Sequence, residues 1–503
     1  MPDQPTQPAP PIGLVIALPH GFELGGVTTW AKRTRDALAA RGGLCELVGP
    51  GINGTAERLG LDDFVRLFAE SIERLRGCGA GPIVLAPQLS GEAYAAACVA
   101  AHHDPGDGIR VVGWMHTDIR YDTELIRRFA PALSRVFCVS LASADHLRRE
   151  RACDPDCLRV IRTGVPVDAA APVATGPAHD PIRLLYVGRL DAFQKRAGAT
   201  LGVVRLLRKR GRACELTIIG DGPSRDATQR EAERLGGVTM PGPVDADRIG
   251  AVYADHDLLL MPSRSEGLGL ARIEAAAHGC VPLVTPGGAA EGIRGGTDGV
   301  VVECPPDAGD AETAERFADA IAGLPAAHLG PMRARCVESA RAIFGMDAFA
   351  HSLVAELHAL HSQEPDRGAR AAIARDPAHA AAFTVPDDFE TRLAAATRDL
   401  AGRRIILHGA GAHTRAIWES LHELGLRIAA VADDDPERWG ATILGVPVIA
   451  PADAGDHDAG VVLISSWLHE DAIWARRQVY EDAGLHVRRI YDRVTEHASQ
   501  SAA

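Results

Sequence analysis

Units of strand, loop and helix repeat along this chain and constrain its fold more than any other feature. The first unit has the apolar run Ile12–Leu18, a loop that ends in Gly25-Gly26-Val27, and a helical pattern of apolar residues through Trp30 and Leu38. Four more strand-length apolar runs follow in the same block, at Ile83–Ala86, Val111–Met115, Val136–Val139 and Arg159–Ile161. Short strands that alternate with helices predict a parallel sheet covered by helices on both faces.

The same pattern occurs twice more, each time after a stretch rich in alanine and proline. The second block begins with strand Arg183–Val187, and the third contains strand Arg404–Leu407. A length of 503 residues, at roughly 150 residues per domain, also favours three domains. We therefore expect an α/β protein with a Rossmann-like domain at residues 12–172, a second at 181–345, a closing helix at 346–362, a linker at 363–387 and a third Rossmann-like domain at 388–496.

Composition excludes several classes of protein. Hydrophobic residues make up 46% and charged residues 24% of the chain, which excludes a largely disordered or fibrous protein. The net charge of −13 gives no general attraction to nucleic acid or to an anionic membrane. No apolar run approaches the ~20 residues of a membrane span, and residues 1–11 lack the basic start of a signal peptide. The ten cysteines are scattered and form no zinc pattern, so we expect a cytoplasmic protein with reduced thiols.

Two glutamates mark one candidate site. A predicted strand at Leu258–Met261 ends in a loop that carries Glu266, and Glu274 lies about one turn into the next helix. Ligands of open α/β sheets bind at the carboxyl ends of the strands, where this loop lies. Gly267 and Gly269 leave backbone N–H groups uncovered near the helix start, which suits a phosphate. The carboxylates suit hydroxyl groups of a sugar and a ribose, although a loop and a surface glutamate would give the same spacing.

Cations gather at the end of another predicted strand. Gly188-Arg189 follows strand Arg183–Val187, and Lys195-Arg196 comes shortly after. The sequence has only three lysines, at positions 32, 195 and 209, against 50 arginines. A compact ammonium group at this edge suits a leaving phosphate as a point charge, whereas a solvated surface cation is the alternative.

These motifs resemble those of the family-4 retaining glycosyltransferases, which have the GT-B fold of two facing Rossmann-like domains. The resemblance spans residues 12–362. In the second block it rests on Val187-Gly188-Arg189-Leu190 with Lys195-Arg196, Ile219–Pro223, Tyr253-Ala254-Asp255, Pro262–Gly267, Glu274-Ala275 with Gly279, and Gly287-Gly288 with Glu291. In the first block it rests on Gly25-Gly26-Val27, Trp114–Asp118 and Thr163–Pro166.

The resemblance implies a nucleotide-sugar co-substrate and a role for each matching residue. Arg189 and Lys195 would bind the diphosphate, and such cations typically contribute roughly 2–4 kcal/mol each in a transition state. Glu266 would hold the sugar, Glu274 the ribose, and His116 would line the sugar pocket. The backbone of the two glycine loops would face the phosphates, at Gly25, Gly26, Gly267, Leu268 and Gly269. The resemblance also implies transfer with retention by attack on the face that the phosphate leaves, with no cofactor required.

Some features depart from the family pattern or test it. The loop after Glu266 lacks the common aromatic residue or proline, and Arg196 either aids the phosphate or faces solvent. Two Asp-x-Asp sequences, at 154–156 and 245–247, fall in predicted surface turns where aspartate is expected. We therefore predict no metal site.

The third block carries a partial dinucleotide fingerprint. Gly409-x-Gly411-x-x-Thr414 follows a strand, and Asp433 closes the next one, but Thr414 replaces the usual third glycine. The block resembles the small Rossmann domain at the front of bacterial sugar O-acyltransferases. That resemblance implies a nucleotide or sugar-nucleotide ligand at Gly409, Gly411 and Asp433. A structural or homo-oligomerising role and an oxidoreductase activity remain alternatives.

The sequence therefore favours a metal-independent transferase that moves a sugar from a nucleotide-sugar to an acceptor. Two alternatives remain: a sugar-nucleotide epimerase or phosphorylase with the same fold, and a non-catalytic sugar-nucleotide-binding protein with the third domain as its output. Acceptor contacts are expected from the loops at residues 20–24, 88–92 and 118–122. Because these loops lack a basic amphipathic stretch, we expect a small or carrier-bound acceptor.

Overall fold

The computed structural model places two parallel sheets in one compact unit and a third sheet in another, with the division after Ala382. The structure describes residues 10–491 except residues 20, 23–24, 53–54, 56–58, 105, 107, 167–172, 175, 192–193, 223, 306–307, 361–366, 382–388 and 468. The α/β class is confirmed by these three sheets, whose strands are parallel except at one edge of the third.

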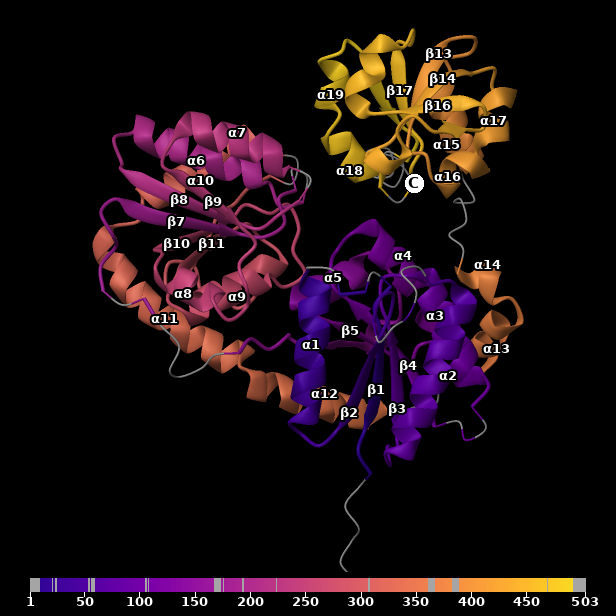
Figure 1. Cartoon of the computed structure of the whole chain (residues 1–503), viewed down its shortest axis with the longest axis horizontal. Helices are drawn as coiled ribbons and strands as arrows, with labels where there is room; N and C mark the ends of the chain where they lie inside the picture. Colours follow the sequence, from indigo (N-terminus) through magenta and orange to yellow (C-terminus); the bar gives the residue numbers. More distant parts are fainter. Residues whose placement is uncertain are drawn as a thin grey trace, which may run out of the picture. The chain divides into compact units, whose positions relative to one another are not determined.

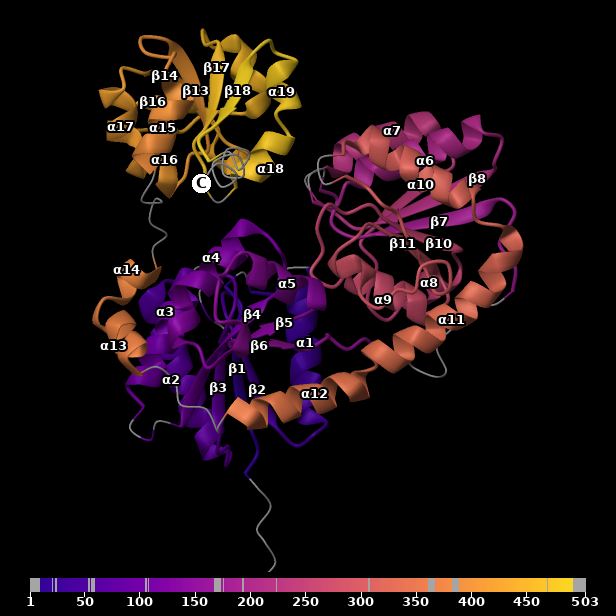
Figure 2. The same ribbon diagram turned by 180° about the vertical axis from the view of Figure 1, so that it is seen from behind.

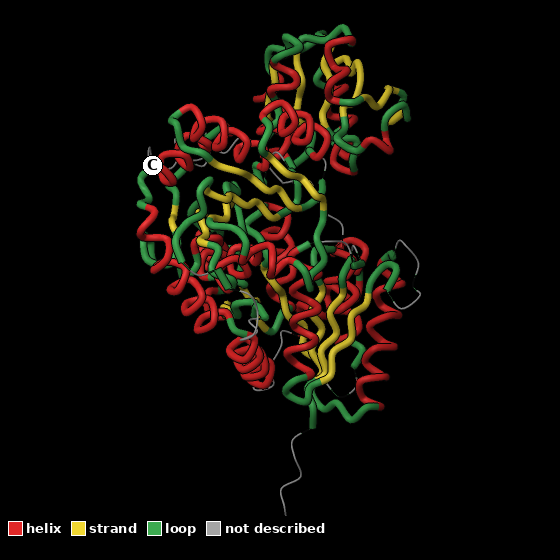
Figure 3. The backbone as a smooth tube through the Cα atoms, turned by 60° about the vertical axis from the view of Figure 1, so that its left-hand side comes forward, coloured by secondary structure: helices red, strands yellow, loops and turns green. Residues whose placement is uncertain are grey.

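The first sheet has the strand order β2-β1-β3-β4-β5-β6 (Figure 1). Its strands are buried apolar runs, and helices cover both faces, as Figure 3 shows from the side. The strands are β1 Gly13–Ala17, β2 Leu44–Val48, β3 Ile83–Pro87, β4 Ile109–Met115, β5 Arg135–Cys138 and β6 Leu158–Val160. The helices are α1 Gly26–Ala39, α2 Leu61–Gly77, α3 Gly91–His102, α4 Arg120–Phe129 and α5 Leu141–Arg149.

The second sheet repeats this architecture with the order β12-β11-β10-β7-β8-β9. Its strands are β7 Ile182–Val187, β8 Cys214–Ile219, β9 Val238–Gly242, β10 Leu258–Met261, β11 Val281–Val284 and β12 Val300–Val301. Its helices are α6 Ala197–Lys209, α7 Arg225–Leu235, α8 Ile249–Ala254, α9 Leu270–Ala277, α10 Asp310–Ala322 and α11 Ala326–Phe344. Helix α12, Met346–Ala359, then returns to the first sheet and packs against α1 (Figure 2).

Part of the predicted linker is instead folded. Residues 367–381 form helices α13 Arg367–Arg375 and α14 Pro377–Ala381, and both pack against α3. Because α14 comes so close, a Cβ at Gly91 would lie 2.2 Å from the carbonyl oxygen of Ala381. This cover explains why α3 is apolar around most of its circumference: it is buried by α2 on one side and by α13 and α14 on the other.

The third sheet has the order β15-β16-β14-β13-β17-β18 and a core of its own. Its strands are β13 Arg404–His408, β14 Arg427–Ala432, β15 Thr442–Ile443, β16 Val446–Ile449, β17 Val461–Ile464 and β18 His486–Arg489. Short helices flank it: α15 Phe389–Thr397, α16 Ala412–Ala416, α17 Trp418–Glu423, α18 Glu470–Ala475 and α19 Gln478–Glu481.

Arg370 provides a test of the docked helices. Its buried guanidinium donates to the carbonyl oxygens of Ala132 at 3.1 Å and Ile109 at 3.3 Å, and to Ser134 Oγ at 3.2 Å. We predict that Arg370→Met lowers the free energy of unfolding of the first unit by about 2–4 kcal/mol, because these buried acceptors lose their donor. Arg375→Met, on the exposed side of the same helix, should change it by less than about 0.5 kcal/mol. Urea unfolding of both variants makes the comparison, and equal midpoints would contradict the structural role of α13.

Candidate active site

A lysine and a glutamate meet where the second sheet ends. Lys195 Nζ donates to Glu266 Oε1 at 2.7 Å, and Ser263 Oγ donates to the same oxygen at 2.7 Å. The Glu266 side chain is only 8% exposed, and Lys195 is 23% exposed. Lys195 follows β7 and Glu266 follows β10, two neighbouring strands, so their loops lie at one edge of the sheet.

Gln194 connects this pair to Arg189. The Gln194 amide donates to the carbonyl oxygen of Ser265 at 3.3 Å and accepts a hydrogen bond from Arg189 Nη2 at 3.2 Å. The Arg189 side chain is 57% exposed and its Nη2 lies 3.9 Å from Asp191 Oδ2, so the guanidinium is accessible to an incoming anion but has a carboxylate beside it. Sequence reasoning missed the role of Gln194, because an amide next to two cations carries no motif of its own.

The structure contradicts both interpretations of Arg196. Its side chain is 1% exposed, and its guanidinium donates to Thr313 Oγ1 at 3.1 Å and to the carbonyl oxygen of Ala308 at 2.6 Å. Burial lowers the pKa of this guanidinium. Arg196 therefore joins the start of α6 to α10, and it neither faces solvent nor is placed to bind a phosphate.

Two glycines are required by close packing around the Glu266 loop. A Cβ at Gly267 would lie 1.6 Å from the carbonyl oxygen of His116, at the end of β4 in the first sheet. A Cβ at Gly288 would lie 2.1 Å from the carbonyl oxygens of both Glu266 and Gly267. Leu268 is buried, and Gly269, at φ +71°, begins α9. The loop is thus held between β4 and the turn after β11.

Glu274 lies on α9 and is held from two sides. Tyr253, which is fully buried, donates its hydroxyl to Glu274 Oε2 at 3.1 Å. Burial and then the Glu274 carboxylate raise the pKa of Tyr253 well above its usual value. On the other side Arg33 of α1 forms an ion pair with Glu274 Oε1. Sequence reasoning missed Arg33, which lies 241 residues from its partner.

His116 directly follows β4 and is buried. Its Nε2 lies 2.8 Å from Gln88 Oε1, and the edge of its ring packs against Trp30 at a centroid distance of 4.6 Å. Burial lowers the pKa of His116 to about 3, so the ring is neutral at physiological pH. At the start of α1, a Cβ placed on Gly25 or Gly26 would meet no described residue within 4 Å apart from chain neighbours, which leaves room for a ligand beside the backbone there.

The predicted acceptor loops are only partly loops. Helix α4 begins at Arg120, so Asp122 lies in its first turn. The carboxylate of Asp122 is 4% exposed and accepts from Thr117 Oγ1 at 2.8 Å. Burial raises the pKa of Asp122 to about 7. In the first predicted loop, residues 20, 23 and 24 lie outside the described residues.

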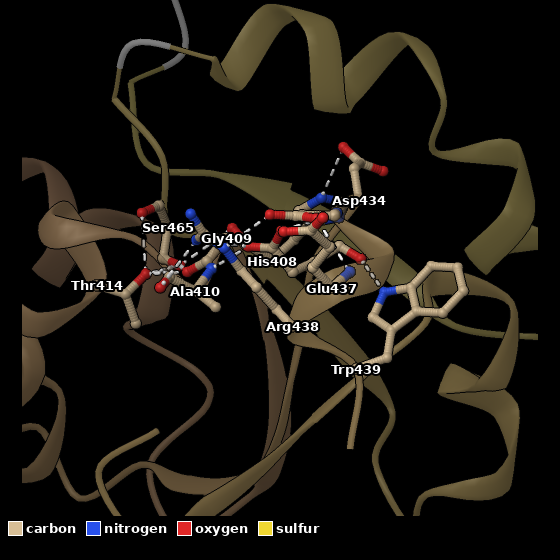
Figure 4. Close-up of polar contacts among 11 residues, drawn as sticks. His408, Gly409, Ala410, Thr414, Asp434, Glu437, Arg438, Trp439 and Ser465 are labelled. Carbon is tan, nitrogen blue, oxygen red and sulfur yellow. Dashed lines mark hydrogen bonds and ion pairs between the residues drawn. The ribbon is translucent and has the colours of Figure 1, made fainter. Parts of the chain in front are cut away.

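In the third sheet, polar groups at the predicted ligand position bond mainly to one another (Figure 4). Asp433 Oδ2 accepts from the backbone N–H of Ala410 at 2.6 Å, between Gly409 and Gly411. Thr414 Oγ1 lies 2.7 Å from Ser465 Oγ and also bonds the carbonyl of Gly409. The carboxylate therefore takes up a loop N–H that a phosphate would need, and helix α16 has only five residues.

With this geometry in view, two family models match the chain. One, described as Glycosyltransferase Family 4, matches residues 24–169, and the other, Glycosyl transferases group 1, matches residues 181–325. Together they cover more than half of the chain. The chain therefore belongs to the family-4 glycosyltransferases of the GT-B fold, as the sequence motifs predicted.

Curated relatives and solved structures agree with this assignment. A D-inositol 3-phosphate glycosyltransferase of Streptomyces scabiei is 29% identical over 274 residues, which are 50% of this chain and 57% of that protein. An alpha-D-kanosaminyltransferase of Streptomyces kanamyceticus is 32% identical over 163 residues, which are 29% of this chain and 41% of that protein. The chain thus spans between about a third and somewhat over half of the length of such relatives.

Solved structures share the fold at low identity. A glycosyltransferase from Rickettsia africae aligns with a TM-score of 0.56 at 15% identity, over 70% of this chain and all of that one. Anabaena HepE in complex with UDP and glucose aligns with a TM-score of 0.52 at 15% identity, over 69% of this chain and 99% of that one.

Within the described part of the chain, no helix combines the length and apolar character that crossing a bilayer requires.

The buried carboxyl of Asp122 predicts a pH-dependent stability. Its pKa is about 7 in the folded chain and near 3.8 in the unfolded chain, so the folded state holds the extra proton between these values. Its contribution to stability is therefore greatest below about pH 4 and is lost as pH rises towards 7. Asp122→Asn should remove about 2–3 kcal/mol of the stability loss between pH 5 and pH 8. Asp62→Asn, in the exposed first turn of α2, is the control, and urea unfolding of the first unit at both pH values measures the difference.

Proposed function

We propose that the chain is a retaining glycosyltransferase that transfers a sugar from a nucleoside diphosphate sugar to a small or carrier-bound acceptor. The observation that carries this proposal is the Lys195–Glu266 pair, joined to Arg189 through Gln194 beside the helix end at Gly269. Two cations and a buried carboxylate beside the N-terminus of α9 suit a diphosphate attached to a hydroxyl-rich group. Membership of the family and the UDP and glucose bound to Anabaena HepE support the same substrate class.

Each group has a defined part in this reaction. Arg189 and Lys195 stabilise the charge that develops on the leaving diphosphate. Glu266 uses Oε1 for Lys195 and Ser263, and its second oxygen accepts hydroxyls of the sugar. Glu274 accepts ribose hydroxyls at the lone pairs that Tyr253 and Arg33 leave unused, since a carboxylate offers about four.

The proposed chemical step needs no enzymic nucleophile. The bond between the anomeric carbon and the phosphate oxygen breaks while the acceptor oxygen bonds to the same face of that carbon. The acceptor proton passes to the departing phosphate oxygen, so the products are the glycoside with retained configuration and the nucleoside diphosphate. His116, neutral and next to Gly267, lies beside the sugar and does not carry charge through the step.

Lys195 provides the sharpest test of this assignment. Lys195→Met should lower kcat by about 30- to 1,000-fold, because one preorganised cation contributes roughly 2–4 kcal/mol to a transition state of this type. Lys209→Met changes an exposed lysine at the end of α6 and should leave kcat within about twofold. Release of nucleoside diphosphate in the presence of acceptor is the measurement. Equal rates for both variants would show that the site lies elsewhere.

A thermal unfolding screen tests the substrate class without an acceptor. A nucleoside diphosphate present at about 100 times its Kd should stabilise the first unit by about 2.7 kcal/mol. UDP, GDP and ADP, followed by their sugar conjugates, form the panel, and Arg189→Met should weaken the response. If none of these nucleotides raises the unfolding temperature, the proposal fails. Sugar epimerisation, or release of sugar phosphate when inorganic phosphate is added, would favour the two alternative enzymes of this fold.

Metal removal provides a further prediction. In the described part of the chain no group of three or more histidine, cysteine or acidic side chains is arranged to hold a metal ion. Asp154, in the first Asp-x-Asp sequence, instead accepts from the N–H of Asp156 at 2.9 Å and caps a turn. Transfer should therefore continue unchanged in EDTA. A loss of activity that Mn²⁺ or Mg²⁺ restores would contradict this part of the proposal.

A further inference from the structure

We propose that Gln88 is a positioning residue that keeps the ring proton of His116 on Nε2, so that Nδ1 accepts a hydrogen bond from a substrate hydroxyl. This inference rests on the proposed function. It adds to that function the direction of the hydrogen bond that His116 can make, with the ring nitrogen as acceptor. The hydroxyl belongs either to the transferred sugar or to the acceptor, and the experiments below separate these sources.

The orientation of the Gln88 amide follows from its two contacts. Its Nε2 donates to the carbonyl oxygen of Ala86 at 3.0 Å. A carbonyl can only accept, so the amide nitrogen must occupy that side and Oε1 must face the imidazole. Oε1 lies 2.8 Å from His116 Nε2 and is itself only an acceptor. The proton between the two residues therefore belongs to His116 Nε2.

The surrounding backbone holds Gln88 in this orientation. Gln88 is fully buried at the end of β3, and its N–H donates to the carbonyl oxygen of Ala17 at 3.1 Å. The next residue, Leu89, has a φ of +46°, which a leucine rarely adopts, and its carbonyl accepts from the Tyr121 hydroxyl at 3.1 Å. Reversal of the amide would set Oε1 against the carbonyl oxygen of Ala86, acceptor against acceptor, at a fully buried position.

The remaining ring nitrogen is then a hydrogen-bond acceptor. Nδ1 of His116 makes no hydrogen bond to any described residue, and the residue keeps 8% exposure. Burial alone keeps the pKa of the ring near 3, so Nδ1 carries a lone pair over the whole physiological range. His116 lies where the Glu266 loop touches the first sheet, at Gly267. An acceptor nitrogen at this position accepts a hydrogen bond from a hydroxyl group and cannot donate one to a carbonyl or phosphate oxygen.

Nitrogen NMR of the resting full-length protein tests the tautomer directly. With ¹⁵N-labelled histidine, the His116 ring should show a protonated Nε2 and a bare Nδ1 from pH 6 to pH 8, with His116→Asn used to assign the signals. Gln88→Met should replace this pattern with an exchanging mixture of tautomers. Gln229→Met changes a partly exposed glutamine of α7 that, among the described residues, bonds Glu233, and it should leave the pattern unchanged. A protonated Nδ1 in the wild type, or an unchanged pattern in Gln88→Met, overturns the proposal.

Kinetics of two Gln88 variants test the consequence for substrate. Gln88→Met should lower kcat/KM by about 3- to 10-fold, the worth of one neutral hydrogen bond. Gln88→Glu keeps the acceptor oxygen but raises the pKa of His116 through its negative charge. Its rate should approach that of the wild type at pH 8.5 and fall at acid pH, because a protonated Nδ1 becomes a donor. Wild type and Gln229→Met should lack this acid limb.

Hydrolysis of the donor without acceptor identifies the hydroxyl, with UDP-glucose as the first probe and then any sugar nucleotide that the thermal screen selects. If Gln88→Met slows hydrolysis as much as transfer, the hydroxyl is on the donor sugar; if it slows only transfer, the hydroxyl is on the acceptor. Wild-type rates for both Gln88 variants at every pH would overturn the substrate contact. If the wild type transfers no sugar, the proposed function is disproved. The NMR experiment needs no turnover, so it still determines the tautomer of His116 in that case.

Discussion

In the candidate site, the backbone of Gly267 packs directly against the carbonyl oxygen of His116. No side chain fits there, since even a Cβ would lie 1.6 Å from that oxygen. This approach joins the end of β4 in the first sheet to the loop after β10 in the second. The neighbouring turn makes a similar demand at Gly288. The position of Glu266, one residue before Gly267, and the position of the buried His116 ring both depend on this packing.

Burial at this junction requires that each polar group has a partner or stays neutral. Glu266 meets the requirement through Lys195 and Ser263, and Glu274 meets it through Tyr253 and Arg33. His116 meets it in the other way, by remaining uncharged beside Gln88. Arg189, which is 57% exposed with Asp191 Oδ2 at 3.9 Å, and Lys195 supply the cationic groups at this edge, whereas the groups proposed to face hydroxyls are neutral or already paired. This division suits a substrate with one anionic end and one uncharged, hydroxyl-rich end.

Sequence patterns predicted the buried central strands and the edge strand β6, but they missed other edge strands. Central strands such as β1 and β10 are continuous apolar runs because both faces are covered. Strands β2 and β18 lie at sheet edges and include Glu46, Arg488 and Arg489, so no apolar run marked them. The helices at 367–381 were mistaken for linker because an Ala-rich composition is common to helices and linkers. Their packing against α3 and the contacts of Arg370, which distinguish them, have no local sequence signal. Partners such as Arg33 and Gln88 lacked any local signal, because long-range packing creates their roles.

The third sheet shows what a short motif does and does not establish. The Gly409-x-Gly411-x-x-Thr414 pattern, from which a nucleotide ligand was predicted, forms the turn between β13 and α16. The hydroxyl of Thr414 is fully buried and bonds both Gly409 and Ser465, so the residue that replaces the third glycine secures the loop to β17. Asp433 completes the turn by accepting from Ala410. These bonds account for the motif as a structural turn, and a ligand at this position would have to displace the carboxylate from the Ala410 N–H.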